Sequence, residues 1–153
     1  MKFNEMSLAV GYVRLIKRDA SGLLLFDQTF KNQLTNYARY ASAQMWTGTI
    51  VVVPSQIQVG NGTIPSSGPL PTDTALWSPM TGTLKQIDYA TTWLSYNTQY
   101  AVTYDVGEAN GQWTELGLFD AAGNLWSHIA VQDFSKDTNE SVTVQWQVTH
   151  LAI

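Results

Sequence analysis

Three acidic residues lie close together in an aromatic-rich part of the sequence, "VGEANGQWTELGLFDAAGNLW" (106–126). Two carboxyl groups held about 5 to 9 Å apart across a cleft perform the acid–base chemistry of glycosidases. Glu108, Glu115 and Asp120 are therefore the candidates for such a site. The alternative is structural, because an Asp at the head of a turn accepts hydrogen bonds from backbone N–H groups. Asp120 opens the turn "DAAGN" and Glu108 lies in an ordinary hairpin loop, so the pattern favours the structural role.

Other catalytic and metal-binding patterns are missing from the sequence. The two histidines, His128 and His150, show no HxH or HxxxH spacing, and there is no Cys to complete a zinc site. No GxSxG nucleophile motif occurs. "GNG" at 60–62 resembles the start of a dinucleotide-binding loop, but Pro65 occupies the third glycine position and no helical pattern follows. We expect no enzymatic activity, no cofactor and no metal.

Composition limits the partners of the chain. Its 153 residues predict one domain, 1–153, with enough apolar content (44%) to fold. The eight Lys and Arg are scattered and the net charge is −4, which argues against nucleic-acid binding. No stretch approaches the roughly 20 apolar residues of a membrane span. The N-terminal residues contain no continuous apolar core of the signal-peptide type, so we expect no export.

Strand signals dominate the chain and predict a mainly β fold, a sandwich or a barrel-like structure. Three hairpins are expected, pairing 7–17 with 22–31, 83–94 with 96–106, and 113–119 with 125–131. In the last segment, 141–153, Val142, Val144, Trp146 and Val148 alternate with Thr and Gln. This alternation predicts one buried and one wettable face, with Trp146 in the core.

One segment has helical spacing. Leu34, Ala38, Ala41 and Met45 recur at helical intervals within 33–48. Thr35 or Asn32 is suited to cap the start of this helix, and Gly48 to end it. We therefore predict one short helix around 35–47 that lies against a sheet.

Two segments are candidates for contact with a partner. The stretch 60–79 holds four of the five prolines, and loops of this length are usually functional or disordered. A terminal arm, 1–6, carries Phe3 and could reach a neighbouring subunit. The predicted interface residues are apolar or aromatic side chains in these segments and in one strand: Phe3, Leu70, Leu76, Trp77 and Trp93.

Three fragments, in order, resemble virion proteins of tailed bacteriophages. "FDQTFKNQLTNYARYASAQMWTG" (26–48) is similar to their strand followed by a Thr-Asn-X-X-Arg helix start. "IQVGNGT…P…TDTALW" (57–77) resembles their I-x-V-G-x-G-T…P…D-T-x-L element. "YDVGEANGQWTELGLFDAAGNLWSHI…FSKDTNESVTVQWQVT" (104–149) resembles their E-A-N-G…E-L/I-G-L-F-D…G-x-L…K…S-L/V-x-V-x-W ending. The resemblance covers most of the chain and is nearest to the small capsid decoration proteins of siphoviruses.

The resemblance implies a β-rich structural protein of the virion with no active site. Its expected partners are the major capsid protein and itself, as a homotrimer, and its expected location is the capsid surface after synthesis in the host cytoplasm. A decoration protein stabilises the assembled head by binding its outside. The alternative is a tail-tip or baseplate protein that contacts host carbohydrate through exposed Trp. A small β-sandwich glycosidase using Glu108, Glu115 or Asp120 is a third, enzymatic alternative.

Overall fold

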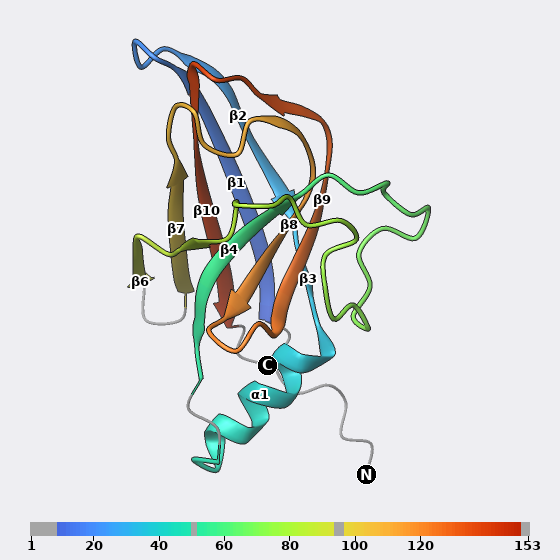
Figure 1. Ribbon diagram of the computed structural model, residues 1–153. Helices are drawn as coiled ribbons and strands as arrows, with labels where there is room; N and C mark the ends of the chain where they lie inside the picture. Colours follow the sequence, from blue (N-terminus) through green and yellow to red (C-terminus); the bar gives the residue numbers. More distant parts are fainter. Residues whose placement is uncertain (1–8, 50–51, 94–96, 151–153) are drawn as a thin grey trace.

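The protein consists of two antiparallel five-stranded sheets packed face to face, with one short helix (Figure 1). The computed structural model describes residues 9–49, 52–93 and 97–150. The predicted mainly β fold with one short helix is confirmed. Phe3 and the proposed arm 1–6 lie outside the described residues.

The first sheet has the strand order β2-β1-β10-β7-β6. Its strands are β1 (Ala9–Asp19), β2 (Leu24–Lys31), β6 (Tyr89–Trp93), β7 (Asn97–Tyr104) and β10 (Glu140–His150). The alternation seen in the sequence sets the face of β10, because Val142, Val144 and Trp146 are fully buried. Val13 of β1 and Tyr100 of β7 pair with Trp146 from either side. The prediction that Trp146 belongs to the core is confirmed.

The second sheet has the order β3-β9-β8-β4-β5. Its strands are β3 (Gln33–Leu34), β4 (Pro54–Gly60), β5 (Lys85–Gln86), β8 (Gly111–Asp120) and β9 (Leu125–Lys136). The predicted hairpins are present as β1–β2, β6–β7 and β8–β9. The segment predicted as one strand, 83–94, is divided, because β5 pairs with β4 in the second sheet and only β6 pairs with β7. Strands β8 and β9 are buried along most of their length, since the first sheet covers one face and other chain segments cover part of the other.

Aromatic side chains fill the space between the sheets. The ring of Tyr104, from the first sheet, meets Trp113 of the second edge-to-face at a centroid distance of 5.4 Å. Trp113 contacts Phe134 at 5.1 Å, and Phe134 contacts Phe26 at 5.0 Å. Such pairs add about 0.5–1.5 kcal/mol each beyond the burial of their area. The hydroxyl of buried Tyr104 lies 2.8 Å from the carbonyl oxygen of Thr83 and 3.1 Å from that of Ile57, so its single hydrogen is shared between the two.

Helix α1 (Asn36–Trp46) lies at one end of the sandwich (Figure 1). Thr35 is its N-cap, as predicted, and its Oγ1 accepts from the backbone N–H of Ala38 at 3.2 Å. Ala38 and Ala41 are the buried residues of the helix. Thr47 is the C-cap, and Gly48 follows it with φ of 71°, a conformation that glycine adopts without a steric penalty.

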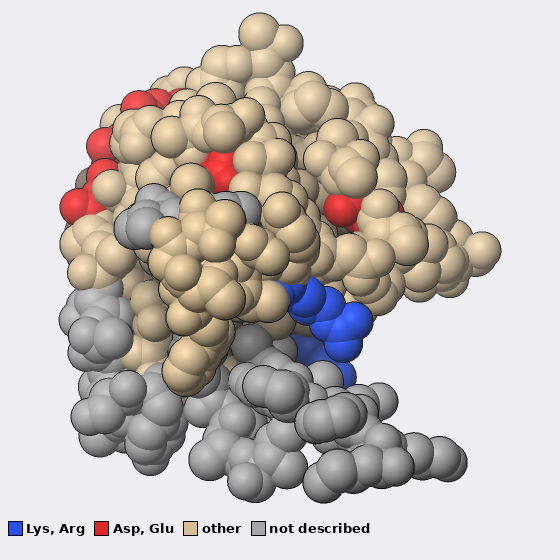
Figure 2. Space-filling view, turned by 90° about the horizontal axis from the view of Figure 1, so that it is seen from below, with Lys and Arg blue, Asp and Glu red and all other residues tan. Residues whose placement is uncertain are grey.

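Between β4 and β5 the chain makes a long irregular excursion, which extends to one side of the sandwich in Figure 1. The part predicted from the sequence, 60–79, contains one bridge, between Gly60 and Pro79. Among the described residues, no helix is long and apolar enough to cross a membrane. The described surface at the helix end of the molecule is mostly uncharged (Figure 2).

Candidate functional site

The carboxylate of Glu115 is completely buried and holds the irregular loop against the second sheet. Glu115 lies in the middle of β8, paired with Gly60 of β4 and Ala130 of β9. The backbone N–H of Ser78 donates to its Oε1 at 2.7 Å, and that of Trp77 donates to its Oε2 at 2.8 Å. A buried backbone N–H needs a partner, and one carboxylate supplies two here. The loop therefore obtains hydrogen bonds that its irregular backbone cannot make to a neighbouring strand.

His128 of β9 connects Glu115 to the tip of the same loop. Its Nε2 lies 2.8 Å from Oε2 of Glu115, and its Nδ1 lies 2.8 Å from Oδ2 of Asp73. The imidazole exposes no surface, and the Trp77 ring packs on it with a centroid distance of 4.5 Å. We call Asp73, Glu115 and His128 the Glu115 cluster.

The side chains of the Glu115 cluster all have hydrogen-bond partners. The two oxygens of Glu115 accept from backbone N–H groups, and Oδ2 of Asp73 accepts from the N–H of Leu70 at 2.9 Å. Each ring nitrogen of His128 in turn has a carboxyl oxygen as its hydrogen-bond partner. Hydrogen bonds to a carboxylate are of the stronger, charge-assisted kind.

Glycine at position 60 provides the space for Glu115. A Cβ built on Gly60 would lie 2.3 Å from Oε1 and 2.5 Å from Cγ of Glu115. Real Cβ contacts are never this short, so any larger residue would displace the buried carboxylate. The "VGNG" sequence around Gly60 therefore reflects this close approach between β4 and the Glu115 side chain.

Asp120 serves a second structural centre at the β8–β9 turn. Its Oδ1 accepts from the N–H groups of Ala122 (2.9 Å) and Asn124 (3.0 Å), and its Oδ2 accepts from Nε1 of Trp126 at 3.0 Å. Burial raises the pKa of Asp120, but the hydrogen bonds from Trp126, Asn124 and Ala122 outweigh it, so the pKa lies below its usual range. The side-chain amide of Asn124 also donates to the hydroxyl of Tyr37 at 3.1 Å, which joins the turn to α1.

The start of α1 is bound to both the loop and the turn. Oγ1 of Thr35 donates to the carbonyl oxygen of Leu125 at 2.6 Å. The N–H of Asn36 donates to the carbonyl oxygen of Pro71 at 2.7 Å. Leu76 from the loop packs with Phe119 and Leu125 in a small apolar cluster. Helix start, loop and turn are thus joined by direct contacts.

The three carboxylates proposed from the sequence have different partners and do not form one site. Glu108 lies on the surface, where its Oε2 binds Lys85 and accepts from the N–H of Asp105 at 2.8 Å. The hydrogen bond from Lys85 is the largest cause that lowers the pKa of Glu108. Glu115 and Asp120 are enclosed by protein, whereas Glu108 lines a surface hollow together with Lys85 and Tyr104. Glu115 and Asp120 each hold a loop in place through hydrogen bonds to backbone N–H groups.

Lys136 is a further buried charged group. Its side chain is almost fully enclosed at the end of β9, and its Nζ donates to Oδ1 of Asn110 at 3.1 Å. Burial lowers its pKa, an effect that Glu140, Glu108 and other nearby carboxylates oppose. Its contacts connect β9 to the β7–β8 turn.

Within the described ranges, no three His, Asp or Glu side chains are grouped to hold a metal ion.

The predicted interface residues occupy different environments. Leu70 is exposed, Trp77 is half-buried against His128, and Leu76 is buried, so Leu76 offers no surface to a partner in this conformation. Trp93 ends β6, and its side chain is outside the described part. Sequence reasoning missed the most exposed aromatic residue described, Trp46, whose relative accessibility is 93%. The exposure of Trp46 could have been predicted, because Trp46 lies outside the apolar stripe formed by Leu34, Ala38, Ala41 and Met45.

Asp73 was also missed. It lies in the proline-rich loop, 55 residues from His128, and no local pattern connects the two.

Compared with family models, with curated proteins and with solved structures, the chain matches none of them.

Proposed function

We propose that this chain is a structural protein of a tailed-phage virion that binds the outside of the assembled head as a decoration protein. The observation that supports it most is the way the three fragments of the resemblance contact one another. The Thr-Asn helix start binds Pro71 and Leu125, the Asp-Thr-Ala-Leu-Trp loop binds Glu115 and His128, and Leu76 packs on Phe119. The shared pattern therefore consists of residues that hold one framework together, as expected of an assembly protein.

The surface provides a second line of support. Trp46 and Tyr40 of α1 are exposed, as is Val53 before β4. Aromatic side chains of this kind are enriched where protein partners bind. A partner that binds only the assembled shell stabilises that shell by mass action, in proportion to the logarithm of its concentration over Kd. Low surface charge reduces the cost of desolvation on binding.

The experiment is co-sedimentation of the purified protein with empty expanded heads, with isolated tails of the same phage as the control. We expect saturable binding to heads at a fixed ratio per capsomer. Trp46→Ala and Tyr40→Ala should weaken this binding. Tyr12→Ala is the matched control, because Tyr12 is a comparably exposed tyrosine on the outer face of the first sheet. Sedimentation equilibrium tests the proposed homotrimer. Absence of binding to heads would refute the decoration function.

The alternative is a tail-tip or baseplate protein that contacts host carbohydrate. The exposure of Trp46 favours it, because a free indole face suits sugar C–H groups. Binding to tails alone would support this alternative. Quenching of Trp46 fluorescence by saccharides and not by heads, compared with the Trp46→Phe variant, would support it independently.

A further inference from the structure

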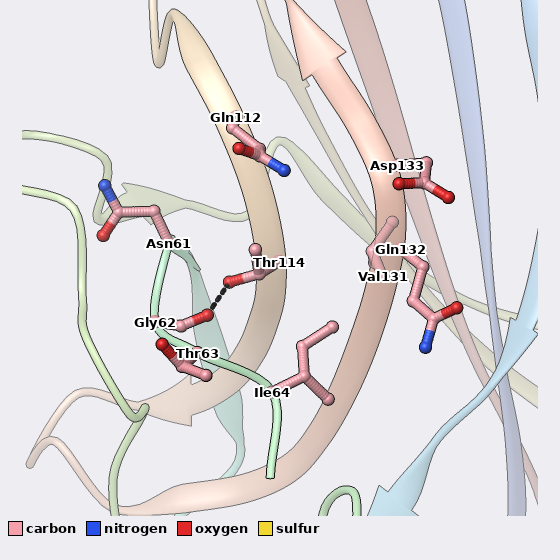
Figure 3. A pocket seen from close by; sticks show the side chains of 9 residues that line it. All are labelled: Asn61, Gly62, Thr63, Ile64, Gln112, Thr114, Val131, Gln132 and Asp133. Carbon is pink, nitrogen blue, oxygen red and sulfur yellow. Dashed lines mark hydrogen bonds between the residues drawn. The ribbon is translucent and has the colours of Figure 1, made fainter. Parts of the chain in front are cut away.

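A polar groove lies between the start of the loop and the β8–β9 hairpin (Figure 3). Its volume is about 370 Å³, within the range of sites that bind small molecules. One wall is formed by residues 61–64, the other by residues 131–133 of β9, and Gln112 and Thr114 of β8 lie between them. In Figure 3 the Gln112 side chain extends across the groove toward the β9 wall.

The first wall is fixed by the contacts of the Glu115 cluster. Thr114, adjacent to Glu115, donates its hydroxyl hydrogen to the carbonyl oxygen of Gly62 at 2.6 Å. The N–H of Asn61 donates to the carbonyl oxygen of Ser78 at 2.9 Å, and Glu115 binds the N–H of Ser78. The backbone at Asn61 and Gly62 is thus held in place before any ligand arrives, which reduces the entropy lost on binding.

The second wall is a bulge in β9. Trp113 pairs with Phe134 and Glu115 with Ala130, so three residues of β9 lie opposite Thr114 alone. Bulges are frequent beside binding sites because they redirect side chains and interrupt the ladder of backbone hydrogen bonds. Asp133 within this bulge has φ of 53°, a strained conformation for a residue other than glycine. Strain of this kind, about 1–3 kcal/mol, is concentrated at functional positions.

The chemistry of the groove selects one class of ligand. Its exposed polar side chains are three amides, a hydroxyl and one carboxylate, from Asn61, Gln112, Gln132, Thr63 and Asp133. No Lys or Arg lines it, which disfavours anions, and one carboxylate is too few for a metal ion. Amides both donate and accept hydrogen bonds, as sugar hydroxyls do. Half-buried Ile64 provides an apolar surface suited to sugar C–H groups.

We propose that this groove binds a neutral saccharide through Gln112 and Asp133, with Asn61, Thr63 and Gln132 at its edges. The site is distinct from the exposed aromatic residues of α1 and does not depend on a role in the virion. Asp133 accepts hydrogen bonds from two neighbouring hydroxyls, and Gln112 donates to or accepts from a third.

The test begins with the labelled full-length chain on an array of neutral, sialylated and sulfated glycans. The best neutral ligand is then titrated into ¹⁵N-labelled protein. We expect the resonances of residues 61–64, 112–114 and 131–133 to shift. Gln112→Ala and Asp133→Gly should each weaken binding about tenfold or more, the loss expected for a hydrogen bond to a neutral or charged group.

Asp133→Gly also tests folding, because glycine adopts this backbone conformation freely and the variant should unfold at the same or a higher temperature. Gln145→Ala, on the outer face of the first sheet, is the matched glutamine control and should bind normally. Three results would each overturn the proposal: no neutral glycan binds, the shifts fall elsewhere, or both groove variants bind as well as the unaltered protein. Binding restricted to sulfated or sialylated glycans would also overturn it.

Discussion

Oε2 of Glu115 and Nε2 of His128 lie 2.8 Å apart, and neither side chain exposes any surface. The two residues belong to the neighbouring strands β8 and β9. Their hydrogen bonds hold the irregular loop between β4 and β5, which is part of neither strand. Through Asp73, Trp77 and Ser78 they bind both the tip and the end of the loop. Carboxylates and imidazoles are also the groups that enzymes use in catalysis. Here they supply the loop with the hydrogen bonds that a neighbouring strand would otherwise make.

Replacing Glu115 with Gln should destabilise the fold by about 3 kcal/mol, because the amide nitrogen would face a donor where the carboxylate now accepts. Urea unfolding measures this loss. Hydrogen exchange should show reduced protection at the Trp77 and Ser78 amides. Glu108→Gln is the matched control, since its exposed pair with Lys85 should contribute less than about 1 kcal/mol. Equal effects of the two substitutions would contradict the proposed role of Glu115.

Both ring nitrogens of His128 should be hydrogen-bonded in solution, because Nδ1 lies 2.8 Å from Asp73 and Nε2 lies 2.8 Å from Glu115. Long-range ¹H–¹⁵N correlation spectra report the shift of each ring nitrogen. In Asp73→Asn, one acceptor is replaced by an amide, so the Nδ1 environment should change more than that of Nε2. An Nδ1 shift that is unchanged in Asp73→Asn would contradict the hydrogen bond between Nδ1 and Asp73.

Asp120 should make the free energy of unfolding depend on pH in the acidic range. Its pKa is lower in the folded chain than its unfolded value of about 3.9, so its contribution is complete above that value. The contribution is lost as the pH falls from about 4 through the lower folded pKa. Asp120→Asn should be less stable at pH 7 and should lose less stability between pH 5 and pH 2. Urea midpoints across this range measure both effects, with exposed Asp133→Asn as the control.

Gly60→Ala should cost about 1–3 kcal/mol, because the new Cβ would overlap the Glu115 carboxylate. The cause can be tested by a double-mutant cycle. In a Glu115→Ala background the atoms that clash are gone, so the penalty for Gly60→Ala should fall by at least about 1 kcal/mol. An unchanged penalty would assign the cost to the backbone of β4 instead.

Much of the fold could be predicted from the sequence because its determinants are local. Alternating Val and Trp residues set the buried face of β10, and Thr35 marked the start of α1. Asp120 could be interpreted correctly because it binds N–H groups only two to six residues away. These interactions depend on spacing along the chain, which a single sequence displays directly.

The rest depends on contacts between distant segments. The register of β8 and β9 brings Glu115 beside His128, and the folding of a distant loop adds Asp73. The bulge in β9 and the strained Asp133 are equally invisible, because no glycine marks them. Burial of Leu76 reverses its expected exposure, since the loop packs on its own domain.

The pairing of β1 with β10 has a consequence for how the chain reaches its native state. Ala9 pairs with His150, and β10 lies between β1 and β7 in the middle of the first sheet. The ribosome makes β1 long before β10, so β1 must wait for this partner while the chain between them is being made. Closure over so long a separation is slow, in the range of milliseconds to seconds for β proteins. Until then β1 lacks the strand that separates it from β7, and a chain in this state exposes unpaired strand edges that favour aggregation.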